Sequence, residues 1–127
     1  MAGKLVSVVK AMLSSFEKND IEGVMARMGT GGQAVDELSR AWMRSGAAMR
    51  KYFKTVAGSV TNIRSKLTDV RENTMGDVGI VTCWLEQDYK LGGKSQHISA
   101  PTTIVLRRGG GEWKIILFHS IPLPEGG

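Results

Sequence analysis

Two histidines and a few carboxylates are the side chains of this 127-residue sequence best suited to acid–base chemistry. His119 is predicted to end the last apolar segment, where an imidazole at a pocket mouth can accept or donate a proton near neutral pH. Asp88 closes an earlier apolar segment, and a carboxyl group held out of water there suits proton transfer. His119 and Asp88 are therefore the candidate catalytic residues. The structural alternative for His119 is a histidine that is hydrogen-bonded at a sheet edge or in a dimer contact. For Asp88 the alternative is a solvated carboxylate beside a hairpin.

Aromatic side chains are the candidates for the wall of an apolar binding site. Trp42, Trp84 and Tyr52, with His119 beside them, could line a cavity for a small hydrophobic ligand. Each of these rings could equally belong to the hydrophobic core. The aromatic residues thus predict a place for a pocket without identifying its ligand.

Metal and cofactor chemistry finds little support in the residue spacings. His97 and His119 have no third metal ligand at a suitable distance along the chain. The glycines of residues 29–32 follow a predicted helix and lack the lysine of a phosphate loop. No nucleophile elbow for a catalytic serine is present. We therefore expect neither a metal ion nor a cofactor.

The bulk composition is that of a globular protein in a reducing compartment. No apolar run approaches the ~20 residues of a membrane span, and Lys10 interrupts the apolar stretch that a secretory signal would need. The single cysteine, Cys83, cannot form an internal disulfide, which favours a cytoplasmic location. The net charge of +5 comes mainly from residues 40–72. No aromatic residues interleave with that charge as they do in single-strand binders, so we expect a solvated basic face and no nucleic acid.

Helical periodicity dominates the first part of the chain. Apolar residues recur at helical spacing over residues 3–17, which predicts an amphipathic helix. Asn19 or Asp20 can cap a second short helix. Ser45 can cap a third helix that ends near residue 58. Residues 29–44 carry no clear periodic pattern and remain unassigned.

Alternation replaces helical periodicity after residue 58 and predicts four strands separated by short glycine turns. Such turns join antiparallel neighbours, so the strands form a curved sheet behind the helices. With no linker or repeat in view, residues 1–127 are predicted to be a single α+β domain. The predicted strands cover residues 59–72, 78–89, 95–108 and 112–121.

Both faces of the predicted sheet carry apolar residues. Pairing across the turns places Trp84 opposite Pro101 and Pro101 opposite His119 on one face, together with Ile115. The opposite face is almost wholly apolar. Because three short helices can cover one face only, we expect the other to pack against a second copy in a homodimer.

Three stretches of the sequence carry a recognisable pattern: residues 41–49 (AWMRSGAAM), 75–82 (MGDVGIVT) and 111–120 (GEWKIILFHS). They are similar to the nuclear-transport-factor-like superfamily, in its SnoaL-like, ketosteroid isomerase-like branch. The similarity in element order extends over nearly the whole chain. It implies a cone, in which a bent sheet wraps around a long helix and leaves a pocket in the open end, and it implies dimers packed through their sheets.

The resemblance leaves the function open, because members of this superfamily include isomerases, cyclases, hydrolases, dehydratases and assembly modules. Ketosteroid isomerase-like members carry an aspartate base soon after the second helix, but residues 28–33 contain no carboxylate. Asp36 and Glu37 come nearest and match no motif of the family, so no catalytic residue is carried over. The first hypothesis is a small-molecule-binding domain with an apolar pocket. The alternatives are an acid–base enzyme acting on a small hydrophobic compound and a dimerising interaction module.

Overall fold

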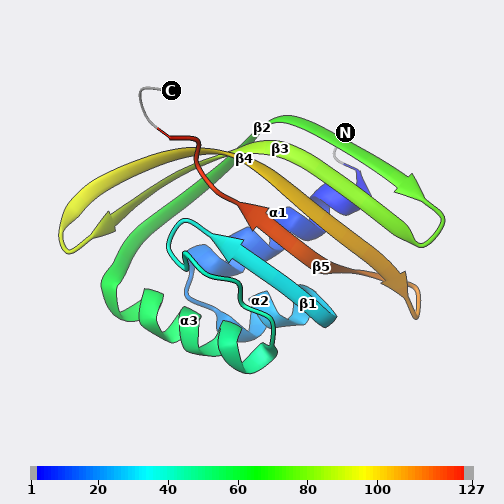
Figure 1. Ribbon diagram of the computed structural model, residues 1–127, viewed down its shortest axis with the longest axis horizontal. Coiled ribbons are helices and arrows are strands. Elements are labelled where there is room, and N and C mark those ends of the chain that lie inside the picture. Colours follow the sequence, from blue (N-terminus) through cyan, green and yellow to red (C-terminus); the bar gives the residue numbers. More distant parts are fainter. Residues whose placement is uncertain (1–2, 125–127) are drawn as a thin grey trace.

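The computed structural model describes residues 3–124, which form helices α1 to α3 and strands β1 to β5. The predicted α+β class, with helices first and a curved sheet after them, is confirmed (Figure 1). Within the described residues, no helix is long and apolar enough to cross a membrane. In chain order the elements are α1 (Lys4–Glu17), α2 (Ile21–Arg27), β1 (Met28–Asp36), α3 (Gly46–Ser59), β2 (Val60–Met75), β3 (Val78–Leu91), β4 (Lys94–Gly109) and β5 (Glu112–Ser120).

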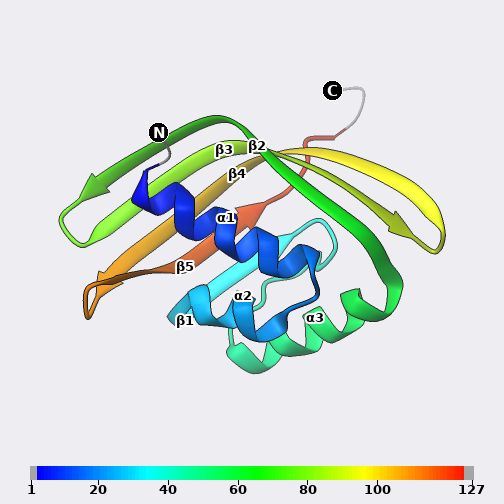
Figure 2. The same ribbon diagram turned by 180° about the vertical axis from the view of Figure 1, so that it is seen from behind.

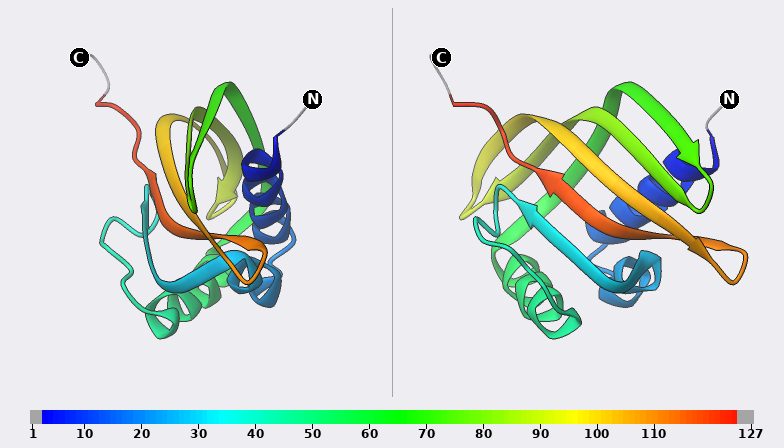
Figure 3. Two further views of the ribbon diagram at one scale, coloured as in Figure 1. Left: turned by 90° about the vertical axis from the view of Figure 1, so that its right-hand side faces the viewer. Right: turned by 45° about the vertical axis from the view of Figure 1, so that its right-hand side comes forward.

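The sheet has the strand order β1-β5-β4-β3-β2 and bends around α1. The meander predicted for the last three strands, β3 to β5, is confirmed, and β2 extends it as a further antiparallel neighbour. The turns contain glycines with positive φ angles, such as Gly76 (φ 61°) and Gly92 (φ 59°). Seen from the helix side, α1 lies across the concave inner face, while α2 and α3 stand at one end of the sheet (Figure 2). The opposite, convex face is the outer face of the sheet, and Figure 3 shows its curvature from the side.

Strand β1 is the element that the periodicity of the sequence did not predict. It pairs parallel to β5, and its register is interrupted between Met28 and Gln33, where Gly31 adopts a positive φ of 78°. Glycines weaken β-propensity and offer no side chain to alternate, so the usual strand pattern is hidden. The chain after β1 folds back along this edge, and Ala34 and Met43 form an antiparallel bridge.

Helix α1 fills the concave face and is bonded to β2 at both ends. Its apolar stripe is buried in the core, with Val9 fully inaccessible. At the N-terminus, where Gly3 supplies no side-chain cap, the backbone N–H of Val6 donates to Glu72 Oε1 at 3.1 Å. At the C-terminus, the N–H of Ser65 donates to Glu17 Oε1 at 2.7 Å. Two glutamates therefore fix the position of the helix along the sheet.

Truncating Glu72 is expected to destabilise the protein because the N-terminus of α1 loses its side-chain acceptor. Glu72→Ala removes the acceptor for a helix N-terminal N–H, and losing such a cap typically costs about 1 kcal/mol of unfolding free energy. Glu72→Gln keeps an acceptor oxygen at the same reach and should lose less than half as much. Urea denaturation of both variants checks this, and equal losses would argue against the hydrogen bond as the cause.

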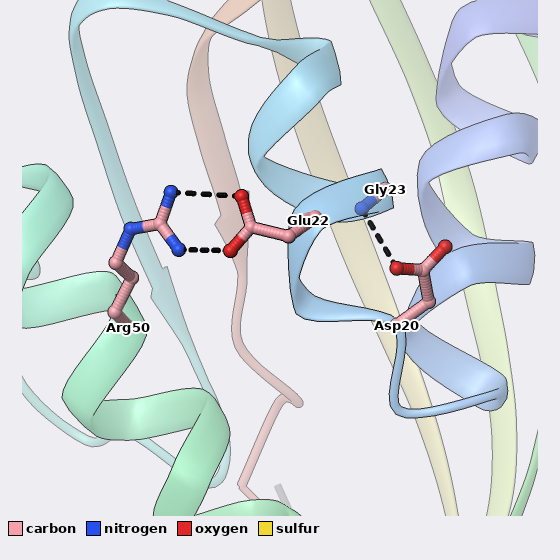
Figure 4. Close-up of polar contacts among 4 residues, drawn as sticks. All are labelled: Asp20, Glu22, Gly23 and Arg50. Carbon is pink, nitrogen blue, oxygen red and sulfur yellow. Dashed lines mark hydrogen bonds and ion pairs between the residues drawn. The ribbon is translucent and has the colours of Figure 1, made fainter.

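The short helices are capped and joined by side chains at the surface. Asp20 accepts a hydrogen bond from the N–H of Gly23 at 3.0 Å, which confirms one of the two predicted caps of α2 (Figure 4). Glu22 and Arg50 form a two-pronged ion pair between α2 and α3, and this hydrogen bond lowers the pKa of Glu22. Ser45 caps α3, as predicted, by accepting from the N–H of Ala48 at 3.0 Å. These contacts fix the end of the cone where α3 stands.

The predicted pairing of β3 with β4 is confirmed, whereas that of β4 with β5 is wrong by two residues. Trp84 lies opposite Pro101 as expected, but His119 lies opposite Thr103. Two shifts of one residue each cause this error. The turn contains both Gly110 and Gly111, so that Gly109 lies opposite Glu112, and a bulge in β5 then shifts the register between the partners of Val105 and Leu106. Ile115 was predicted to share a face with Trp84 and His119, but the bulge places it on the opposite face, where it is fully buried in the core.

Candidate functional site

A cavity of about 50 Å³ lies between the concave face of the sheet and the helices. A single water molecule needs roughly 10–15 Å³ of such space, so the cavity is large enough for several ligand atoms. Its wall is mostly apolar. Four methionines contribute to the wall, and their side chains are flexible enough to adapt to a ligand. The apolar lining residues are Met12, Leu13, Phe16, Val24, Met28, Ala34, Leu38, Met43, Met49, Phe53, Leu85, Ile98 and Phe118.

Asp36 is one of two carboxylates that line this apolar cavity. It is the last residue of β1, and Tyr52 on α3 donates its hydroxyl to Oδ2 at 2.6 Å, with Oδ1 at 2.9 Å. The N–H of Ser39 donates to Oδ1 at 2.8 Å, which fixes the carboxyl group from the other side. Burial raises the pKa of Asp36, although the hydrogen bonds from Tyr52 and Ser39 act in the opposite direction. The site therefore holds an oriented carboxyl group whose pKa lies above that of an exposed aspartate.

Tyr52 is held in its neutral, donating form by the same surroundings. Burial and the neighbouring Asp36 carboxylate raise the pKa of the Tyr52 hydroxyl far above its usual range. Tyr52 thus acts as a permanent hydrogen-bond donor to Asp36, and not as a proton acceptor in its own right.

Glu37 forms a second carboxylate–tyrosine pair directly beside the first. Tyr89, buried on β3, donates its hydroxyl to Glu37 Oε2 at 3.0 Å. Burial and this hydrogen bond raise the pKa of Tyr89 to about 12, so its hydroxyl keeps its proton. Asp36 and Glu37 also line a groove on the other side, of about 360 Å³, together with Arg40. The two carboxylates therefore stand in the wall between this groove and the inner cavity.

Of the residues predicted to bind a ligand, Tyr52 lines the cavity, whereas Trp42, Trp84 and His119 do not. Trp42 is 43% exposed and lies against His119, with ring centroids 5.8 Å apart. Trp84 is partly exposed, and its partner Pro101 is on the same side of the sheet. The structure thus divides the predicted set, because strand alternation turns Trp84 and His119 to the outer face while the helices cover the inner one.

Asp88, the second predicted catalytic residue, lies at the solvent-exposed end of the β3–β4 hairpin. Its Oδ1 is 2.7 Å from Nδ1 of His97, and both side chains are exposed. The neighbouring Glu86 accepts from the Ser99 hydroxyl at 3.0 Å. The structure does not bring Asp88 together with His119 or with the cavity, so the predicted catalytic pair is not assembled in the described residues.

The family to which this fold belongs follows from comparison with known proteins. The family model described as SnoaL-like domain matches residues 5–124. The chain belongs to the SnoaL-like family. This confirms the resemblance that was expected from the sequence, and it places the cavity inside a fold that this SnoaL-like protein shares with many solved structures.

The structural neighbours of this SnoaL-like protein carry several different names. A candidate dehydratase of the NTF2-like family from Streptomyces avermitilis has a TM-score of 0.82 and 20% identity, covering 94% of each chain. A ketosteroid isomerase-like protein from Erwinia carotovora atroseptica has a TM-score of 0.80 and 17% identity, covering 95% of each chain. A candidate aromatic ring hydroxylase from Novosphingobium aromaticivorans reaches 0.87 at 14% identity, over 95% of this chain and 87% of the other.

At these identities the likeness shows the fold alone. The comparison with curated protein sequences finds no match. The names of these neighbours therefore do not assign an activity to this SnoaL-like protein, and the residues of its own cavity are the basis for one.

Sequence reasoning did not identify Asp36, Glu37 and Tyr89 as site residues. Asp36 and Glu37 were the carboxylates nearest to the expected position, but without a visible strand they could not be aligned with it. The one available signal was the short apolar pair of Ala34 and Val35 directly before them, which are both buried on β1. Recognising that pair as the end of a strand would have placed the next carboxylate at the edge of the sheet.

Removing the Tyr52 hydroxyl is expected to raise the pKa of Asp36 further. The hydroxyl stabilises the ionised carboxylate, so Tyr52→Phe leaves burial as the main influence. A carbon-13 NMR titration of the Asp36 carboxyl group measures the change. Tyr89→Phe is the matched control, because it removes the donor to Glu37 instead, and a larger shift of Asp36 in this control than in Tyr52→Phe would contradict the assignment.

Proposed function

We propose that this SnoaL-like protein binds a small, mostly apolar molecule in the inner cavity and that Asp36 transfers a proton to or from it. The observation that carries the proposal is an oriented carboxyl group in an apolar cavity, with its pKa raised by burial. A proton-transfer group works best when its pKa approaches the working pH. Tyr52 would be a positioning residue, because its hydroxyl holds the carboxyl group in one orientation.

The names of two structural neighbours agree with this proposal without testing it. The dehydratase and isomerase classes both involve proton movements, but the identities of 20% and 17% limit those comparisons to the fold. The geometry of Asp36 and Tyr52 is therefore the basis of the proposal, and the apolar wall limits the ligand to a small molecule with little polar surface.

The methionine methyl groups offer a direct test of ligand binding. Met12, Met28, Met43 and Met49 line the cavity, whereas Met75, the last residue of β2, is 55% exposed. We expect a small apolar compound to shift the methyl NMR signals of the cavity methionines in a saturable way while leaving Met75 unchanged. Shifts confined to Met75, or none in the cavity methionines with any small apolar compound, would reject the proposed binding.

Catalysis is tested separately from binding. A compound that binds in the cavity and carries an exchangeable C–H should exchange hydrogen for deuterium faster with the wild type than with Asp36→Asn. If the compound binds but its exchange does not depend on Asp36, the proposed proton transfer is rejected and only the proposed ligand binding stands.

We further propose that the outer face of the sheet packs against a second copy of the chain. Apolar side chains on this face are only partly covered, among them Trp84, Val105 and Leu117. An aspartate at position 117 would introduce a charge into such an interface at a cost of several kcal/mol. Sedimentation analysis should therefore show a dimeric wild type and a monomeric, folded Leu117→Asp. A monomeric wild type at high protein concentration would reject the dimer.

A further inference from the structure

The hydrogen-bond donors of the cavity wall are almost all used within the protein. The Tyr52 hydroxyl donates to Asp36. The hydroxyl of Thr102 donates to the carbonyl of Ala100, so the Ser120 hydroxyl, 2.8 Å from Thr102 Oγ1, is the donor in their contact. Gln87, which is only 7% exposed, donates from Nε2 to Ser65 at 3.1 Å. A ligand in the cavity finds at most the second amide hydrogen of Gln87 as a free donor.

The hydrogen-bond acceptors of the wall, by contrast, are in excess. Each carboxylate oxygen can accept about two hydrogen bonds. Within the described residues, Asp36 Oδ1 accepts a backbone N–H, and the Tyr52 hydroxyl lies within reach of both Asp36 oxygens. Glu37 Oε2 accepts from Tyr89, while Glu37 Oε1 has no protein donor. Ser120 Oγ also keeps free lone pairs once its hydrogen is directed at Thr102. The cavity therefore favours a ligand that donates hydrogen bonds.

The charge of the cavity wall has one sign. Asp36 and Glu37 are its ionisable carboxyl groups, and the described residues that line it include no lysine, arginine or histidine. Neither carboxylate takes part in the ion pairs found within residues 3–124. The nearby Arg40 lines the outer groove and not the cavity. In an apolar surrounding a negative charge interacts with a ligand charge far more strongly than in water.

We propose that the ligand of this cavity is a small alkyl compound with a protonated amine, whose ammonium group lies between Asp36 and Glu37. This inference rests on the proposed function and gives it a substrate class. An ammonium group supplies up to three N–H donors and a positive charge, which is what the free acceptors of the wall lack. It also favours the ionised form of Asp36, so that binding of the cation and ionisation of the carboxyl group reinforce each other.

The same wall disfavours the other common polar groups. A carboxylate or phosphate ligand would face two carboxyl groups without a cationic partner. A ketone or ester, which can only accept hydrogen bonds, would leave the free acceptors of the wall unpaired. The apolar part of the ligand is limited by the cavity of about 50 Å³ to a short or branched alkyl chain, with adjustment by the methionines.

Three compounds of nearly the same shape separate these possibilities. Isobutylamine, isobutanol and isobutyrate are cationic, neutral and anionic at about pH 8. Their affinities are measured on the wild-type protein from the methyl NMR shifts of Met12, Met28, Met43 and Met49. We expect the amine to bind at least about tenfold more tightly than the alcohol, a difference of ~1.4 kcal/mol, and the acid to bind most weakly.

Variants of the carboxylates identify the cause of the preference. Glu37→Gln should reduce the ratio of amine to alcohol affinity by about fivefold, which is ~1 kcal/mol, whereas Glu112→Gln, an exposed carboxylate outside the cavity, should leave the ratio unchanged. Equal affinities for amine and alcohol, or tighter binding of the acid, would overturn this inference while the proposed cavity binding stands. Failure of all three compounds to shift the cavity methionines would overturn both.

Discussion

Asp36→Asn is expected to abolish proton transfer in the cavity and, at pH values above the folded pKa of Asp36, to raise the free energy of unfolding. The two effects have one origin, which is the burial of a carboxyl group that must ionise to act as a base. An asparagine keeps an oxygen for the N–H of Ser39 and an amide group facing Tyr52, yet it carries no charge. Function and stability thus oppose each other at this residue, as is common where a buried group serves chemistry.

The pH dependence of this gain has a definite sign. Because burial raises the pKa of Asp36 in the folded state, the folded protein holds its proton at pH values where the unfolded chain has released it. The stabilisation is fully present below the unfolded value of about 3.9 and is lost as the pH rises through the folded pKa. The variant has no such loss. Its advantage over the wild type therefore grows with pH, by about 1.4 kcal/mol for each unit by which the folded pKa is raised.

Urea denaturation at acidic and alkaline pH measures that advantage. Asp88→Asn is the matched control, since the Asp88 side chain is exposed beside His97 and lies outside the cavity. We expect the stability difference between variant and wild type to grow with pH for Asp36→Asn more than for Asp88→Asn. A pH-independent loss of stability in Asp36→Asn would mean that the ionised carboxylate is well accommodated, contrary to the proposed role.

Truncation of Ile104 is expected to cause the largest loss of stability among the changes considered. Ile104 on β4 is fully buried on the inner face and does not line the cavity, so Ile104→Ala removes core packing and leaves the site in place. Such deletions of a buried isoleucine cost about 2–5 kcal/mol, from lost transfer energy and from the cavity left behind. The measurement is the midpoint and slope of urea unfolding.

Val105, the next residue along β4, is the matched control for Ile104. It points to the outer face, where it is only partly covered. In dilute protein Val105→Ala should cost about 1 kcal/mol or less. At higher concentration a dimer through the outer face would make that cost larger. A loss at Val105 equal to that at Ile104 in a dilute monomer would contradict the assignment of the inner and outer faces.

The parts of the fold that the sequence predicts are those where one periodicity persists without interruption. The stripe of α1 and the alternation of β3 and β4 extend over long segments, and turns such as Gly92 and Gly93 fix the pairing of Trp84 with Pro101. The bulge in β5 breaks this regularity, since one additional residue reverses the face of Ile115 and, together with a two-glycine turn, moves the partner of His119 by two residues. A bulge leaves no signal in the apolar pattern when both faces of a strand are apolar.

The candidate site was unpredictable for a related reason. Its polar residues come from a strand hidden by glycines and from two tyrosines on other elements, Tyr52 on α3 and Tyr89 on β3. Only the folded chain brings them to Asp36 and Glu37. The sequence did show a polar cluster around Asp88. Its residues are polar because this end of the hairpin is exposed to water, and this exposure is unrelated to function.

The proposed role of Asp36 as a proton-transfer group depends most directly on the pKa of its carboxyl group. A carbon-13 NMR titration of the wild-type protein, with the signal assigned by its absence in Asp36→Asn, yields the midpoint of ionisation. We expect a midpoint above the ordinary aspartate value of about 3.9 that moves downward when isobutylamine is bound. A midpoint at or below that ordinary value in the free protein would contradict the proposed role of Asp36.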